Sequence, residues 1–528
     1  MSIVAVWRSF KGGFLTKARV AFVAFVAIYA SFLLVNLGYN SIRWDELVHC
    51  MGAWQLIHGR FLMYLTSSTF YPPMFNLVTA AFFGAGGANV VSARLVAVTF
   101  TVLSLAVLFE FVNKMYGSGV ALLSVVFFAV MPGVVWASRL AYIETMLEFF
   151  FLFSLFFFFV WLQKGNNKYL FAGGLTLGLG FLVKYQMLVA GLVMFVTLCV
   201  FGWKYLKSKL SRFSLLILIA AAVVVAWFVI IYVYAPGTLS DWIYAISVGD
   251  QKRSLYSMRF PTPVFYLIEM AQPFPDMHPI SSFLYLLGFA GLGLMAWQRR
   301  RQDKFLVVWF AVVYAVFTLV GNREWRYVMP LFPVLAISAS SAVTSAYDKA
   351  KASWQAPAAK AKRRTLSKVA AVVLIVFTAS AVVVSCGDSY HWIEWDKVNI
   401  PLQEAVSFVA ARIQPNESIA LVCTFELFSG GMASFYLQTS NEQNSVLQYP
   451  ALPTDTFTPT FNVHELVSLC QQNNARYVLM SEHHWTATYF NSTLTPQDVA
   501  AMVYDSGRFT SLTTVGTTPD RIFVLTFA

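Results

Sequence analysis

Long apolar runs, separated by short polar links, dominate the first 386 residues of the chain. Most runs have about 17 to 25 residues, which is the length that an α-helix needs to cross roughly 30 Å of hydrocarbon. The pattern therefore predicts a polytopic α-helical membrane protein. We expect eleven spans, over residues 19–39, 90–112, 118–135, 140–163, 168–183, 185–203, 213–235, 279–298, 304–321, 327–347 and 368–386.

The apolar piece over residues 74–83 decides the orientation of every later span. It is too short to cross the membrane, so we expect a helix that lies along the outer interface. With this reading, every dense basic cluster falls on the side of the N-terminus, where cytoplasmic loops collect Lys and Arg. These clusters are Lys114; Lys164 and Lys168; Lys204, Lys207, Lys209 and Arg212; Arg299, Arg300, Arg301 and Lys304; and residues 349–368. We therefore expect a protein of the cell membrane whose N-terminus lies in the cytoplasm.

The last 140 residues have a different pattern, in which short β-rich runs alternate with amphipathic helical stretches. This alternation predicts a compact extracytoplasmic α/β domain over residues 387–528, after a transmembrane domain over residues 1–386. The expected strands and helices are 419–424, 476–481 and 521–526, and 402–412 and 463–473.

Composition agrees with a membrane protein and separates the two parts by charge. The chain is 58% apolar and 12% charged, whereas a soluble domain has about 25% charged residues. Residues 1–386 hold 32 Lys and Arg against 12 Asp and Glu, and residues 387–528 hold 5 against 13. Nucleic-acid binding is the rival account of a basic chain. Because the basic residues lie in loops between spans, we expect no nucleic-acid partner.

The predicted topology places several ionisable residues at or near the outer face. Such residues at membrane depth are costly and are candidates for function. Simpler readings exist for each one alone: a solvated loop, a snorkelling lysine or an arginine bound to lipid phosphate. The candidates are Asp45, Glu46, His49, Arg94, Arg139, Glu144, Lys184, Arg326 and the neighbouring Tyr327.

Together these residues suit transfer from a phosphate-linked donor. Cations would neutralise the phosphate of the leaving group, and a carboxylate would deprotonate an incoming hydroxyl. The sequence contains no Walker loop, GxGxxG element or zinc-spaced Cys/His cluster. Because nucleotide sugars are not supplied outside the cell, the donor would have to be embedded in the membrane.

An ordered set of motifs over about residues 15–350 resembles the GT-C glycosyltransferases, most closely protein O-mannosyltransferases and the aminoarabinose transferase of lipid A. This resemblance implies a polyprenyl- or dolichyl-phosphate-linked monosaccharide as donor, an inverting transfer and a site at the outer membrane face. The motifs are WDELVH (44–49), YPPM (71–74), SARL (92–95), SRLAYIETMLEFF (138–150), GLGFLVKYQ (178–186) and REWRYVMPLFP (323–333).

The resemblance implies catalytic roles for three acids. Asp45 matches the proposed catalytic base, and its neighbour Glu46 is expected to orient the acceptor or the loop. Arg139 and Glu144 match an Arg…Asp pattern of these enzymes, except that this sequence has Glu144 at the position of the usual Asp. His49 is a candidate contact to sugar or acceptor, with a structural hydrogen bond as the alternative.

The same resemblance implies that Lys184 and Arg326 contact the donor phosphate. Tyr327 belongs to the same motif as Arg326, and Arg94 is a further substrate-binding candidate. Some relatives hold a divalent cation on a DxD pair, which both outer loops of this sequence lack. We expect no metal or other cofactor, although Asp45 and Glu144 could share a cation if they converge.

The predicted function is therefore transfer of a sugar to a protein, lipid or glycan acceptor. The rival from another class is a transporter or flippase of a polyprenyl-linked lipid or sugar. Such transporters usually contain inverted repeats and broken helices at the membrane midplane, and the sequence indicates neither. A second rival is a binding protein whose outer domain carries the function and whose spans only anchor it.

Overall fold

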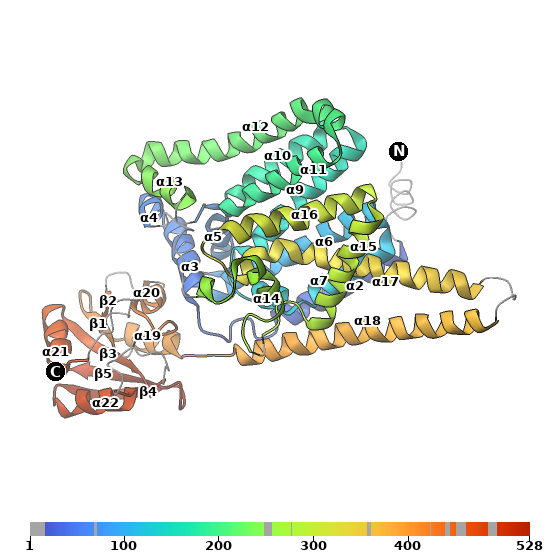
Figure 1. Cartoon of the computed structure of the whole chain (residues 1–528). Coiled ribbons are helices and arrows are strands. Elements are labelled where there is room, and N and C mark those ends of the chain that lie inside the picture. Colours follow the sequence, from blue (N-terminus) through green and yellow to red (C-terminus); the bar gives the residue numbers. More distant parts are fainter. Residues whose placement is uncertain are drawn as a thin grey trace, which may run out of the picture. The chain divides into compact units, whose positions relative to one another are not determined.

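The computed structural model describes residues 16–67, 71–247, 256–275, 277–355, 361–422, 424–438, 444–449, 461–483 and 494–528. Internal contacts divide the chain into two compact units, whose elements are labelled in Figure 1. The helical unit contains the described residues of 1–35, 55–82 and 94–396. The sheet unit contains those of 36–54, 83–93 and 397–528.

The helical unit is built from helices that follow one another with short links. Its elements are α2 (Lys17–Leu34), α4 (Phe61–Ser67), α7 (Ser118–Ala129), α8 (Pro132–Ser138), α9 (Glu144–Lys164), α10 (Asn167–Phe181), η1 (Tyr185–Met187), α11 (Leu188–Val200), α12 (Trp203–Tyr234), η2 (Pro236–Thr238), α13 (Leu239–Ser247), η4 (Tyr256–Met258), η5 (Thr262–Val264), α14 (Phe265–Ala271), α15 (Ser282–Gln298), α16 (Arg301–Leu319), η6 (Trp325–Leu331), α17 (Phe332–Gln355) and α18 (Ala361–Trp395). The division between units runs through α3 (Trp44–Ile57), α5 (Met74–Gly86) and α6 (Val90–Tyr116).

Seven helices within the described residues are long and apolar enough to cross a membrane, or eight if the bent pair α7 and α8 is one span. The two members of that pair meet at 68°. Each of the eleven predicted ranges contains a helix, so the prediction of a polytopic helical membrane protein is confirmed. The count of eleven and the orientation stay predictions. The short helix α5 has 13 residues, and its interfacial position also stays a prediction.

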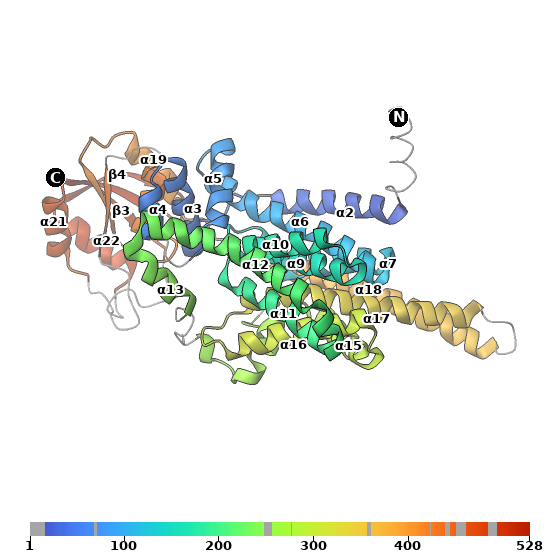
Figure 2. The same ribbon diagram turned by 90° about the horizontal axis from the view of Figure 1, so that it is seen from above.

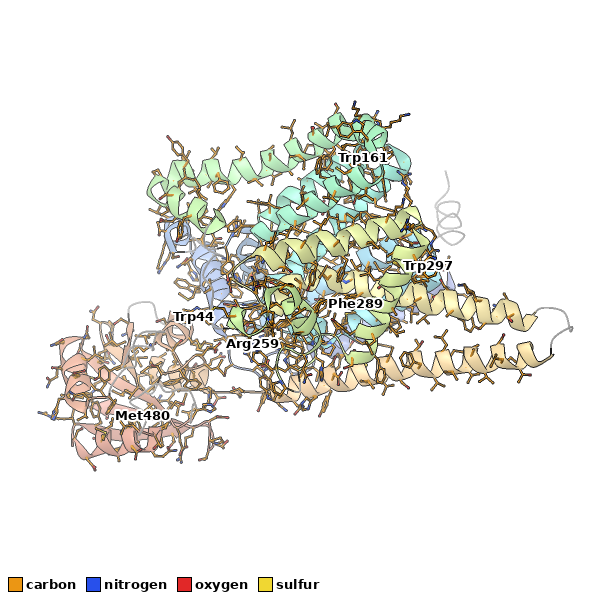
Figure 3. All side chains as sticks on the ribbon, viewed as in Figure 1. Trp44, Trp161, Arg259, Phe289, Trp297 and Met480 are labelled. Carbon is orange, nitrogen blue, oxygen red and sulfur yellow. The ribbon has the colours of Figure 1, made fainter. Side chains whose placement is uncertain are left out.

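Helix α9 and the run from η6 into α17 form the centre of the helical unit, since 83% of the residues in the most apolar stretch of each are buried. The corresponding share is 11% for α2, 17% for α18 and 22% for α12, so these helices present apolar side chains for lipid. Figure 2 gives the view from above. Trp161 on α9 is fully buried, whereas Trp297 near the end of α15 is 83% exposed (Figure 3).

Small residues let α15 and α17 approach closely, which is how helices pack in the absence of a hydrophobic driving force between them. Ser338 Oγ on α17 donates a hydrogen bond of 2.7 Å to the carbonyl oxygen of Gly288 on α15. A Cβ added at Gly291 would lie 2.1 Å from the carbonyl oxygen of Ser338. Because that atom is backbone, only separation of the two helices could relieve the overlap.

We therefore expect Gly291→Ala to destabilise the protein, by about 1–3 kcal/mol or more as in other overpacked sites. Gly293→Ala is the matched control on the same helix, because its Cβ would meet nothing within 4 Å. Alanine is the better helix former by up to about 1 kcal/mol, so the control should melt at the same or a higher temperature. Thermal melting in detergent checks this, and equal melting temperatures for the two variants would contradict the close approach.

The sheet unit contains a five-stranded sheet in the order β2-β1-β3-β5-β4. Strands β1, β2 and β3 are parallel, and β5 pairs antiparallel with both β3 and β4. Its core includes Val478, Met480 and Leu525, which are fully buried (Figure 3 labels Met480). The elements are α19 (Leu402–Ala410), β1 (Ser418–Val422), α20 (Gly430–Gln438), β2 (Ser445–Tyr449), α21 (Val463–Gln472), β3 (Ala475–Ser481), α22 (Pro496–Asp505), β4 (Phe509–Val515) and β5 (Ile522–Phe527).

The predicted C-terminal α/β domain is thus confirmed, and its three expected strands correspond to β1, β3 and β5. The predicted boundary at residue 386 falls inside α18, which continues to Trp395. The apolar sequence ends at Cys386, but the helix continues through polar and aromatic residues. Contacts place the boundary between Asp396 and Lys397.

Candidate active site

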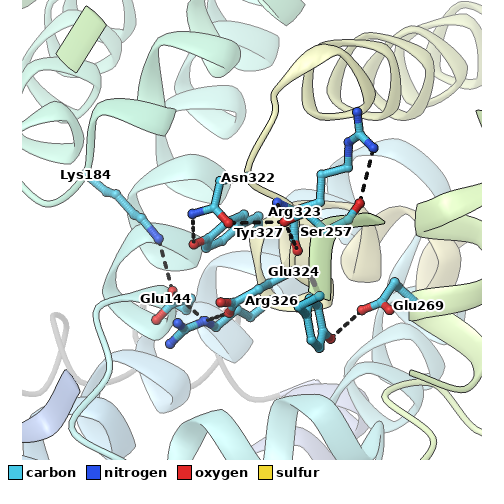
Figure 4. Close-up of polar contacts among 10 residues, drawn as sticks. Glu144, Lys184, Ser257, Glu269, Asn322, Arg323, Glu324, Arg326 and Tyr327 are labelled. Atoms are coloured by element: carbon cyan, nitrogen blue, oxygen red, sulfur yellow. Dashed lines mark hydrogen bonds and ion pairs between the residues drawn. The ribbon is translucent and has the colours of Figure 1, made fainter. Parts of the chain in front are cut away.

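The first turn of α9 carries a buried carboxylate that faces two cations. Glu144 is the first residue of this helix, and its side chain is 4% exposed. The dipole of a helix places partial positive charge at this end and favours a carboxylate there. Figure 4 shows Lys184 and Arg326 pointing toward the same carboxylate.

Lys184 lies in the link between α10 and η1, where its extended backbone (φ −157°, ψ 139°) ends the helical run. Its Nζ donates a hydrogen bond of 3.1 Å to Oε1 of Glu144, and the side chain is 12% exposed. The ammonium also lies 4.6 Å from the ring centre of Tyr327, within cation–π range. Because an ammonium has three N–H donors, this geometry leaves capacity for a phosphate oxygen.

Arg326 enters the cluster from η6. Its Nε lies 3.9 Å from Oε1 of Glu144 and also forms an ion pair with Glu324. The centre of the guanidinium is 5.2 Å from the ring centre of Tyr142. A guanidinium offers a planar fork that matches phosphate oxygens. Arg326 and Lys184 therefore form a cationic pair that one buried carboxylate holds in place.

Arg139 makes contacts of a structural kind. Its two terminal nitrogens donate to the carbonyl oxygens of Leu33 and Val35, each at 2.8 Å. These carbonyls end α2, where a cation is favoured. Burial, and then the nearby positive charge of Arg94, lower the pKa of Arg139. Arg94 itself is 1% exposed on α6. Substrate binding by these two arginines stays a prediction.

The remaining candidate residues lie at the start of α3. Glu46 is fully buried and accepts the backbone N–H of Arg43 at 3.0 Å, as the acid of a capping box does. His49 is 2% exposed, whereas Asp45 is half-buried. Residues at adjacent positions of a helix point in different directions, so Asp45 and Glu46 have different surroundings. These residues belong to the sheet unit, and convergence of Asp45 with Glu144 stays a prediction.

The carboxylates beside the cations do not resemble a metal centre. Within the described residues, no three His, Cys, Asp or Glu side chains gather as metal ligands would. Glu144 and Glu324 both pair with Arg326, so a cationic side chain already engages the carboxylate oxygens that a divalent cation would need as ligands. The N–H donors of Lys184 and Arg326 fit a phosphate group better than a divalent cation, and metal independence stays a prediction.

Three residues in the cluster or one helical turn from it were not among the sequence candidates. Glu324 and Tyr142 both contact Arg326, and each lies two positions before a predicted residue. Glu148 lies one helical turn after Glu144, is 2% exposed, and neither carboxyl oxygen has a hydrogen-bond partner among the described residues. The four-residue spacing on one helix was the available signal. A buried ionisable group in a membrane helix is a functional candidate.

Comparison with known proteins relates this cluster to a fold. The family model for dolichyl-phosphate-mannose-protein mannosyltransferase matches residues 71–229, a range that contains Glu144 and Lys184. ArnT from Cupriavidus metallidurans in the apo state is similar in structure, with a TM-score of 0.62 at 16% identity over 96% of this chain and 97% of that chain. The chain has the GT-C fold. The resemblance inferred from the motifs is confirmed at the level of the fold.

Two further GT-C structures are similar to the chain. ArnT from C. metallidurans bound to undecaprenyl phosphate has a TM-score of 0.62 at 15% identity, over 96% of this chain and 97% of that chain. The archaeal oligosaccharyltransferase AglB from Archaeoglobus fulgidus, in complex with an inhibitory peptide and a dolichol-phosphate, has a TM-score of 0.53 at 12% identity. The latter match covers 88% of this chain and 70% of that chain. No curated protein sequence matches.

Proposed function

We propose that the protein is an integral-membrane glycosyltransferase that uses a polyprenyl- or dolichyl-phosphate-linked sugar as donor. The observation that carries this proposal is the cluster of Glu144, Lys184 and Arg326 in a chain with the GT-C fold. Buried cations of this kind suit a phosphate at the membrane boundary. The acceptor is a hydroxyl of a protein, lipid or glycan on the outer face.

The proposed reaction breaks the bond between the anomeric carbon and the phosphate oxygen of the donor. The acceptor oxygen attacks the anomeric carbon from the opposite face, which inverts its configuration. The acceptor proton passes to the carboxylate of Asp45, the proposed general base. The bonding electrons leave with the phosphate, and the products are the glycosylated acceptor and polyprenyl phosphate.

Lys184 and Arg326 are proposed to stabilise the charge that grows on the departing phosphate. Preorganised donors in a site of low dielectric are effective because they need not reorient during the reaction. Glu144 sets their geometry, since it accepts from Lys184 at 3.1 Å and lies 3.9 Å from Arg326. The ArnT structure with undecaprenyl phosphate supports a polyprenyl-phosphate-linked donor, because that lipid is what such a donor leaves behind.

The proposal is tested with the purified protein in proteoliposomes that contain a labelled polyprenyl-phosphate sugar and an outer acceptor extract. We expect label in the acceptor, polyprenyl phosphate in equal amount, and a product anomer opposite to that of the donor. We expect no metal requirement, so addition of EDTA should leave the rate of sugar transfer unchanged.

A transporter would give a different result in the same vesicles. It would move the intact lipid-linked sugar between leaflets, and polyprenyl phosphate would not form. Protection of the donor from a membrane-impermeant oxidant would then change with time, whereas the acceptor would stay unlabelled. This outcome would replace the transferase by the rival function.

A further inference from the structure

Residues 256–271, which lie outside the long apolar spans, are bound to the turn 322–327 that carries Arg326. The anchor is Arg323, whose backbone N–H donates to Ser257 Oγ at 2.9 Å and whose Nη1 donates to Thr262 Oγ1 at 3.0 Å. Ser257 is 1% exposed and Arg323 is 7% exposed. Figure 4 shows this contact beside the cationic pair.

Glu269 on α14, whose side chain is fully buried, holds this part of the segment in place. Its carboxylate accepts the hydroxyl of Tyr256 at 2.6 Å and forms an ion pair with Arg259. Burial raises the pKa of Glu269, and the hydrogen bonds and the charge of Arg259 oppose that rise. One carboxylate thus holds the residues on both sides of Ser257, which binds the turn.

Ser257 binds Asn322 and Arg323, which begin the turn that carries the cation of the site. Trp325 stands between Glu324 and Arg326, whose side chains form an ion pair. The ring of Tyr327, the next residue, lies 4.6 Å from the ammonium of Lys184. Fixing Asn322 and Arg323 therefore restricts the direction of the Arg326 side chain and the place of the Tyr327 ring.

The turn is also fixed internally. Asn322 Nδ2 donates to the hydroxyl of Tyr327 at 3.3 Å, and Ser257 Oγ lies 3.4 Å from Asn322 Oδ1. The segment itself is held to neighbouring helices by Tyr285, which donates to the carbonyl of Leu267 at 2.9 Å. The segment that binds the turn is therefore itself anchored to α15.

We infer that Glu269 is a positioning residue for the donor phosphate, acting through Ser257 and the turn 322–327 on Arg326 and Tyr327. The inference rests on the proposed function, because it assigns Arg326 to the phosphate. Glu269 is not assigned a contact with substrate. It sets how well the cations match the phosphate, so its loss should affect donor binding more than acceptor binding.

The test compares Glu269→Gln with Asp303→Asn in the full-length protein. Asp303 is a matched control because it is also fully buried and accepts from a tyrosine hydroxyl, Tyr116 at 2.6 Å, and from Arg300 Nε at 2.8 Å. Asp303 has no contact with the turn 322–327 among those described. Both variants should lose thermal stability, but only Glu269→Gln should weaken undecaprenyl phosphate binding and raise the donor KM, by about tenfold.

Binding is measured with undecaprenyl phosphate and with uncharged undecaprenol, so that the phosphate contribution is isolated. Tyr256→Phe removes one hydrogen bond to Glu269 and should give a smaller shift in the same direction, which keeps the test open if Glu269→Gln does not fold. Unchanged phosphate binding and donor KM in these variants would overturn the inference. Wild-type protein that neither binds undecaprenyl phosphate nor transfers sugar would instead overturn the proposed function.

Discussion

Asp45→Asn should lower kcat for sugar transfer by about a hundredfold to ten-thousandfold, the range that general-base catalysis contributes. The amide cannot accept the acceptor proton, although it keeps the size of the side chain. The donor KM should change little, because the proposed base acts on the acceptor and not on the phosphate. Initial rates with a polyprenyl-phosphate sugar at saturating acceptor measure both quantities.

Two other acids serve as controls for this substitution. Glu404 is an exposed acid in the first turn of α19, so Glu404→Gln removes a charge at a helix start without touching the site. Glu46→Ala removes the acceptor for the N–H of Arg43 and should cost stability, as other lost caps do. Full activity of Asp45→Asn would exclude Asp45 as the base.

The membrane helices were predictable because the length of an apolar run determines whether a helix can cross the membrane. The range predicted for 140–163 became α9 at Glu144–Lys164, whereas α12 begins at Trp203 instead of 213 and α18 covers Ala361–Trp395 instead of 368–386. The bend of 68° between α7 and α8 was not predicted, because the apolar run continues through it. Pro132, which begins α8, lacks the N–H that a continuous helix would require and marks the restart.

Part of the candidate site was also within reach of the sequence. Motifs 40 residues apart supplied Glu144 and Lys184, which the structure brings to 3.1 Å. The capping role of Glu46 could not be predicted, because the motif WDELVH does not indicate which of its two carboxylates accepts a backbone N–H. The sequence did not reveal Glu269, because its partners depend on how segment 256–271 folds against turn 322–327.

Arg139 illustrates why a motif match leaves a role open. An arginine at the predicted outer face suits a lipid phosphate, yet its guanidinium is bound to carbonyls of Leu33 and Val35. The carbonyls at the end of a helix lack partners within that helix, and their positions follow only from packing. Such competition between backbone and ligand for the same donors cannot be read from spacing.

Lys184→Ala should raise the donor KM or lower kcat, by about tenfold to a hundredfold, since a hydrogen bond to a charged group contributes about 1.5–3 kcal/mol. The substitution removes an ammonium that Glu144 orients at 3.1 Å and leaves Arg326 as the nearest cation to that carboxylate. Lys184→Arg keeps the charge in a longer, planar group and should retain part of the activity. Kinetics with varied donor separate the two effects.

Lys164→Ala is the matched control for Lys184→Ala. Lys164 is the last residue of α9, at the end opposite to Glu144. Its ammonium also lies over a tyrosine, 5.4 Å from the ring centre of Tyr169, so both variants lose a cation–π contact of a lysine near a membrane boundary. Only the loss of Lys184 should weaken binding of undecaprenyl phosphate, and added salt should narrow the difference little, because the Lys184 side chain is mostly buried. Equal effects of the two substitutions on donor kinetics would show that Lys184 only reaches toward the interface, and the phosphate would then have to be bound through Arg326.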